Sequence, residues 1–62
     1  MIPRRDELEG MTTNERLFAA GLLDGFDRAV ADRDGAQVRQ ILRAVFVDEP
    51  SIELILRDHD LD

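Results

Sequence analysis

A serine–histidine pair is the catalytic arrangement to consider first, since this 62-residue chain has one histidine, His59, and one serine, Ser51. A general base must lie within hydrogen-bond reach of the nucleophile that it activates. In the helix expected over residues 50–58 these side chains are about two turns apart, at opposite ends. We interpret His59 as a capping or half-buried packing residue, since a helix C-terminus favours a cation. We therefore expect no catalytic residue and no enzyme activity.

Three C-terminal acids, Asp58, Asp60 and Asp62, alternate with other residues as the first ligands of a calcium loop do. The glycine and the glutamate that complete such a loop are missing. We interpret the segment as a solvated acidic tail, with a weak surface cation site as the alternative. The chain has no cysteine, so it can form neither a disulfide nor a cysteine-based zinc site. We expect no metal and no cofactor.

Arg39 and Arg43 are one helical turn apart and could grip a phosphate or a carboxylate. The alternative, which we favour, is a solvated face on which they pair with nearby acids. All 8 basic residues are arginines against 14 acids, so the net charge is −6. The would-be recognition helix of a helix-turn-helix, residues 50–58, lacks the side chains that read base edges. These features disfavour a nucleic-acid partner.

Apolar periodicity and capping signals predict three helices. Thr12 and Glu15 form a capping-box pattern that opens a helix over residues 12–33. Asp34 can cap a second helix that ends at Phe46 and Val47, and a third runs from Pro50 to about Asp58. The predicted fold is all-α: a small three-helix domain over residues 12–62, with an antiparallel helical hairpin plus a short third helix. Residues 1–11 are expected to form a flexible N-terminal tail.

Size and hydropathy limit the remaining functions. No apolar run approaches the roughly 18 residues of a membrane span, and no apolar segment follows Arg4 and Arg5 as in a signal peptide. We therefore expect a cytoplasmic protein without a membrane partner. A pocket of about 300 Å³ or more is difficult to enclose with so few residues, so we expect no small-molecule substrate.

An interaction surface is the function that the apolar residues favour. Gly21 and Gly25 are spaced as G-x-x-x-G, which would leave a smooth groove on the first helix, with intramolecular packing as the alternative. Other apolar residues fall off the main stripes or lie at a helix end. The predicted surface consists of Leu17, Gly21, Gly25, Phe46, Val47, Leu54 and Leu61.

We favour a homodimer, because the chain is small, has no disulfide and has apolar residues outside the main helical stripes. We predict a small acidic, non-enzymatic protein–protein interaction module that self-associates or binds an unidentified protein partner. The alternative is an acidic inhibitor of a basic partner, such as an antitoxin, an immunity protein or a nucleic-acid mimic. This alternative follows from the C-terminal charge, because residues 48–62 contain six acids and one arginine.

Overall fold

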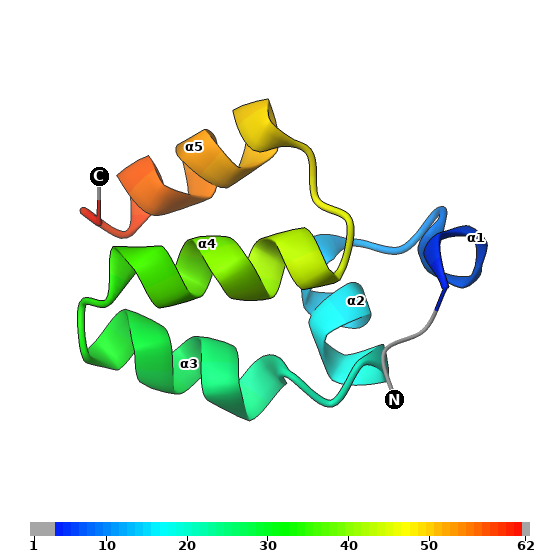
Figure 1. Ribbon diagram of the computed structural model, residues 1–62, viewed down its shortest axis with the longest axis horizontal. Helices are drawn as coiled ribbons and strands as arrows, with labels where there is room; N and C mark the ends of the chain where they lie inside the picture. The colour runs from blue at the N-terminus through cyan, green and yellow to red at the C-terminus, as the bar shows by residue number, and fades with distance from the viewer. Residues whose placement is uncertain (1–3, 62) are drawn as a thin grey trace.

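The computed structural model describes residues 4–61, and within this range it contains five helices and no strand (Figure 1). The prediction of an all-α fold is confirmed, but five helices take the place of the expected three. The helices are α1 (Arg5–Leu8), α2 (Thr13–Ala19), α3 (Leu23–Ala31), α4 (Gly35–Ala44) and α5 (Glu49–Asp58).

Helix α4 lies in the middle of the molecule, with α3 on one side and α5 on the other (Figure 1). The short turn between α3 and α4 makes them run antiparallel. Helix α2 packs against α3 at the end that is remote from this turn. The C-terminal end returns to the turn, where Arg33 Nη2 donates a 2.7 Å hydrogen bond to the carbonyl oxygen of Asp60.

Side-chain caps begin the three helices whose starts the sequence predicts. The Thr12 hydroxyl accepts from the Glu15 amide at 3.2 Å, and the Thr12 amide donates to Glu15 Oε1 at 2.8 Å, which completes the capping box. The Asp34 carboxylate accepts from the Gln37 amide at the start of α4. The Asp48 carboxylate accepts from the Ser51 amide, so α5 begins at Glu49, one residue before Pro50.

The helix predicted over residues 12–33 is interrupted at Gly21, which has φ +71°. The Gly21 amide donates to Phe18 O and the Leu22 amide donates to Leu17 O, the bond pattern of a Schellman C-cap. Glycine adopts this left-handed conformation without steric cost, so the chain turns here and starts α3 in a new direction. The prediction of one long first helix is therefore wrong, and Gly21 is a helix stop.

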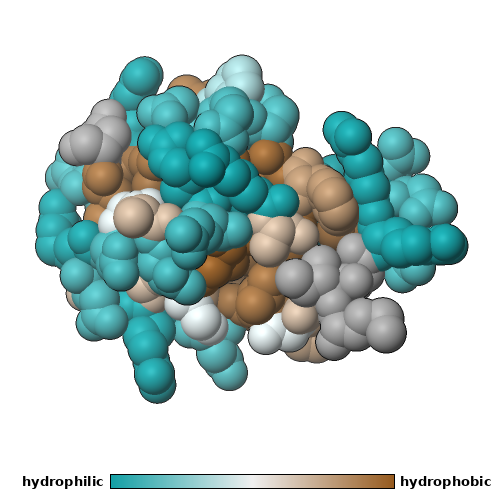
Figure 2. Space-filling view, viewed as in Figure 1, coloured by the Kyte–Doolittle hydropathy of each residue, from teal (hydrophilic) through white to brown (hydrophobic). Residues whose placement is uncertain are grey.

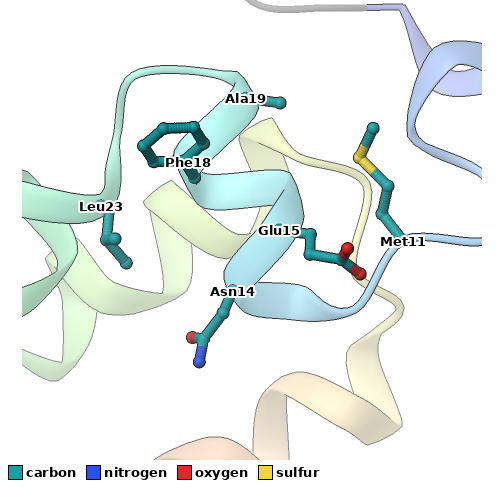
Figure 3. Close-up of a pocket in the computed structure, with 6 residues that line it drawn as sticks. All are labelled: Met11, Asn14, Glu15, Phe18, Ala19 and Leu23. Atoms are coloured by element: carbon teal, nitrogen blue, oxygen red, sulfur yellow. The ribbon is translucent and has the colours of Figure 1, made fainter.

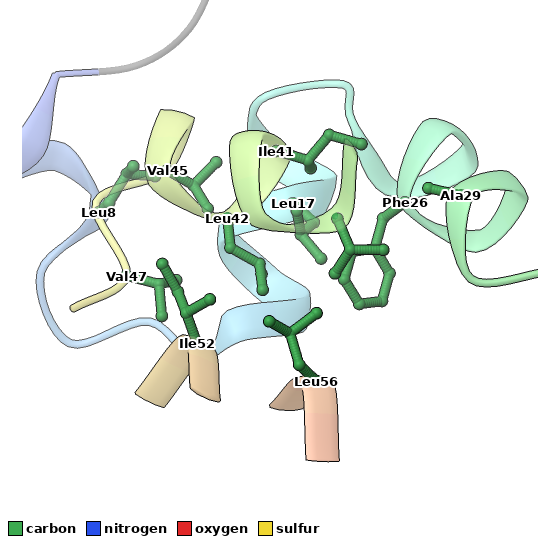
Figure 4. Packing of buried hydrophobic residues seen from close by; sticks show 11 residues of the cluster. Leu8, Leu17, Phe26, Ala29, Ile41, Leu42, Val45, Val47, Ile52 and Leu56 are labelled. Carbon is green, nitrogen blue, oxygen red and sulfur yellow. The ribbon is translucent and has the colours of Figure 1, made fainter. Parts of the chain in front are cut away.

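The core joins all five helices and contains no buried polar side chain among the described residues (Figure 4). The exposed area of the chain, 4325 Å², is close to the roughly 4,100 Å² that area scaling gives for a folded monomer of this size. The exposed area is therefore that expected of a folded chain of this size. The core residues are Leu8, Leu17, Phe26, Ala29, Val38, Ile41, Leu42, Val45, Val47, Ile52 and Leu56.

The N-terminal segment belongs to the fold more than the sequence suggests. Helix α1 is one turn long, and its Leu8 is only 1% exposed. The Met11 amide donates to Leu8 O at 3.1 Å, which turns the chain toward α2. Within the segment expected as a flexible tail, residues 1–11, the structure thus places one helical turn, and residues 1–3 lie outside the described part of the chain.

Two helical glycines differ in what surrounds them, and this predicts that an added methyl group stabilises the fold at only one of them. A Cβ at Gly25 would meet only Ile41 Cδ1, at 4.0 Å, whereas a Cβ at Gly35 would lie 2.8 Å from the Leu61 carbonyl oxygen. Gly25→Ala should therefore raise the free energy of unfolding by about 0.5–1 kcal/mol, the helix-propensity gain. Gly35→Ala should lose this gain because the backbone at Leu61 must move.

Urea unfolding followed by circular dichroism measures both glycine variants against the parent chain. Destabilisation by Gly25→Ala would contradict the open position assigned to Gly25. An equal gain from Gly35→Ala would contradict the close packing of the C-terminal segment on the start of α4.

Candidate interaction surface

A shallow apolar groove of about 450 Å³ runs along the outer face of α2 (Figure 3). Phe18 is the most exposed large apolar side chain of the described residues, at 76%. Met11 lies before α2 and Leu23 begins α3, so two chain connections form the ends of the groove. We call this set the α2 groove; its lining residues are Met11, Asn14, Glu15, Phe18, Ala19 and Leu23.

Consecutive residues of α2 have opposite environments. Leu17 is fully buried and Phe18 points away from the core. Around a helix, Asn14 and Glu15 lie within about 60° of Phe18, whereas Leu17 is about 100° away. Because α2 ends at Ala19 and the chain turns at Gly21, the face that carries Phe18 is not continued by a further turn of α2.

The charges beside the apolar part of the α2 groove are negative. Glu15 lines the groove, and its capping bond with the Thr12 amide lowers the pKa of Glu15. Asp27 is exposed and follows Leu23 by one helical turn, so it lies beside Leu23 on α3. By helical geometry Arg28 is about 140° away from Leu23, on another face of α3.

The nearest arginine in α2, Arg16, is turned toward the backbone of other segments. Its Nε donates to Met11 O at 3.3 Å, and its Nη1 donates to Val45 O at 3.2 Å and to Phe46 O at 3.1 Å. These bonds join the start of α2 to the turn after α4. Arg16 leaves α2 about 160° around the helix axis from Phe18, and it is not among the residues that line the α2 groove.

Phe46 is an exposed aromatic residue in a left-handed backbone conformation. It is 41% exposed and has φ +63°, a conformation that is costly for a bulky residue. The Phe46 amide donates to Arg43 O and the Val47 amide donates to Leu42 O, so Phe46 occupies the position that glycine usually takes in a Schellman cap. The packing of Val45 and Val47 on either side holds it there.

The structure separates the seven residues of the predicted interaction surface. Leu17 and Val47 belong to the core and therefore offer no surface, and Leu61 is half-buried against the core. Gly21 and Gly25 are exposed, but Gly21 lies in a turn, so the two do not form a helical groove. Phe46 and Leu54 are exposed large apolar side chains, at 41% and 56%.

Figure 2 shows apolar atoms in the middle of one face of the molecule, surrounded by hydrophilic side chains. The α2 groove differs from the expectation for these residues, because an uninterrupted helix over residues 12–33 would place Phe18, Ala19 and Leu23 on its buried face. The spacing of Leu17, Gly21 and Leu22 is the local signal that could have revealed the break, since a Schellman cap often pairs two such apolar residues.

Arg39 and Arg43 pair with acids of α5, which agrees with the pairing that we favoured over a phosphate site. Arg39 Nη1 lies 2.8 Å from Glu53 Oε1 and 3.4 Å from Glu49 Oε1. The Arg43 guanidinium donates two bonds to Glu49, at 2.8 and 3.0 Å. These contacts link α4 to α5, and the bonds with Arg43 lower the pKa of Glu49 and raise that of Arg43.

Ser51 and His59 lie at opposite ends of α5 and do not form a pair. Ser51 Oγ donates to Asp48 Oδ1 at 2.8 Å, and His59 follows the last residue of the helix. The His59 ring is exposed and meets Phe26 edge to face, with ring centroids 6.2 Å apart. Within residues 4–61, no three acidic or histidine side chains come together as metal ligands do, and Asp62 lies outside this range.

Acid should destabilise the fold through three carboxylates with lowered pKa values. The pKa values of Glu49, Asp48 and Glu15 are lowered mainly by bonds with Arg43, Ser51 and Thr12. A group with a lower pKa in the folded state stabilises the fold above its unfolded pKa, and this contribution is lost as the pH falls through the folded value. The free energy of unfolding should therefore decrease from about pH 5 downward.

Urea titrations across this pH range, followed by circular dichroism, measure the decrease. The matched control is Glu49→Gln, whose stability should depend less on pH because one of the three carboxylates is removed. A constant or rising stability toward low pH would contradict the roles of these hydrogen bonds and ion pairs.

Comparison of the chain with protein-family models, curated proteins and solved structures gave no match. Among the described residues, no helix combines the length and the apolar character that are needed to cross a bilayer.

Proposed function

We propose that this protein is a small acidic, non-enzymatic interaction module that binds another protein chain through the α2 groove. The exposure of Phe18, 76% beside a groove of about 450 Å³, is the observation that supports the proposal most strongly. Aromatic side chains in apolar depressions are typical anchors of protein interfaces. The chain does not need Phe18 for its core, because the core is complete without it.

The bound chain is either a second copy, which would make the protein a homodimer, or a different protein in the cytoplasm. Phe46 and Leu54 add exposed apolar surface on other segments. The acidic-inhibitor function remains a second candidate, since the net charge of −6 favours encounter with a basic protein. Arg39 and Arg43 pair with Glu53 and Glu49, so part of the negative charge of residues 48–62 is neutralised within the chain.

A photoreactive benzoylphenylalanine at position 18 tests the proposal in extracts of cells that express the chain. We expect one discrete cross-linked product, either a dimer of the chain or an adduct with one other protein. The same probe in place of Leu54, which is exposed on α5, is the matched control and should not give this product. Absence of a product from position 18, or the same products from both positions, would contradict the proposed function.

A further inference from the structure

We infer that the occupant of the α2 groove is a short amphipathic helical segment of another protein, with apolar residues on one side and lysine or arginine beside them. This inference rests on the proposed function and specifies its partner. The first argument is charge: Glu15 and Asp27 lie beside the apolar side chains Phe18 and Leu23. The positive charges nearest in sequence, Arg16 and Arg28, project from other faces of their helices.

The groove charge stays negative at neutral pH. The Thr12 amide bonds to the Glu15 carboxylate, which holds this acid in its ionised form. Arg16 donates to the carbonyl oxygens of Met11, Val45 and Phe46, and its own side chain does not line the α2 groove. Among the described residues no arginine lines the α2 groove, so a basic segment would meet an acid beside its apolar contacts, while a second copy of net charge −6 would be repelled.

The second argument is size. A standard protein interface buries about 800 Å² on each partner, which would be about a fifth of the 4325 Å² surface of this chain. The α2 groove lies on a helix of seven residues, which is about 10 Å long. A helix-in-groove contact with a few apolar anchors fits this length, whereas a stable dimer of the whole chain needs a wider surface.

Nuclear magnetic resonance with synthetic helical peptides tests the inference on the intact chain, which lacks tryptophan and tyrosine for fluorescence. The probe is an amphipathic peptide of leucine and lysine. Two control peptides keep its pattern: in one, glutamate replaces lysine, and in the other, serine replaces leucine. We expect the leucine–lysine peptide to shift the amide resonances of Phe18, Ala19 and Leu23, and both controls to bind at least about tenfold more weakly.

Phe18→Ser should weaken binding of the leucine–lysine peptide by about tenfold or more, and Leu54→Ser should change it less than about twofold. Both residues are exposed, so both variants should keep the circular dichroism spectrum of the parent. Equal binding of the glutamate or serine peptide, or equal binding by Phe18→Ser, would overturn the inference. Shifts of the same amides on dilution without peptide would identify a second copy as the occupant and overturn it too, while leaving the proposed function intact.

Discussion

Leu17→Ala is expected to lower the free energy of unfolding by about 3 kcal/mol. Leu17 is fully buried, and it lies among side chains from other helices in the centre of the core (Figure 4). Truncation removes apolar contacts and leaves a cavity that the short helices cannot fill. A core of this size rarely supplies more than about 3–5 kcal/mol, so a large fraction of the variant should be unfolded at room temperature.

Phe18→Ala is the matched control for Leu17→Ala, since the two residues are adjacent in α2. Phe18 is 76% exposed, and its truncation should change stability by less than about 0.5 kcal/mol. Urea unfolding of the two variants measures the difference. The opposite order of effects would indicate the uninterrupted helix over residues 12–33, in which Phe18 faces the core, and would contradict the break at Gly21.

Leu8→Ala is expected to lower the free energy of unfolding by about 2 kcal/mol, at the lower end for a buried leucine because α1 is only one turn long and can adjust. Leu8 is 1% exposed and covers the end of the core beside Val45 and Val47 (Figure 4). The exposed neighbour Glu9 provides the control, and Glu9→Ala should have almost no effect. A loss below about 0.5 kcal/mol from Leu8→Ala would show that the N-terminal segment is not part of the folded unit.

The parts of the fold that follow from local chemistry could be predicted from the sequence. The capping box of Thr12 and Glu15 and the cap by Asp34 depend on residues three positions apart, and both form as expected. The apolar stripe of α4 also faces the core as expected, with Val38, Ile41 and Leu42 buried. These features need no knowledge of distant segments.

The break at Gly21 could not be read from periodicity, because the apolar residues before and after it continue one helical stripe. Glycine costs a helix only about 1 kcal/mol, so the sequence pattern alone permits both a continuous helix and a Schellman stop. Tertiary packing decides between them, since the break lets Leu17 and Phe26 enter the same core. The exposure of Phe18 follows from this choice and was therefore missed with it.

Long-range contacts explain the other differences. Leu8 is one apolar residue in a charged segment of the sequence. The residues next to it in the sequence do not indicate that it packs in the same core as Val45 and Val47. Phe46 adopts a left-handed backbone conformation that is unfavourable for a phenylalanine. Its carbonyl oxygen accepts a hydrogen bond from Arg16, which is 30 residues away in the sequence. Patterns within a short stretch of sequence do not indicate which distant residues will be in contact.

The central claim, that another chain covers the α2 groove, is tested most directly by hydroxyl-radical footprinting followed by mass spectrometry. The isolated chain and the chain in an extract of its own cells are oxidised side by side. We predict that Phe18 and Met11 react readily in isolation and are protected several-fold in the extract, whereas Phe46, an exposed residue of the same chemistry, reacts equally in both. Equal oxidation of Phe18 in both samples would contradict the claim.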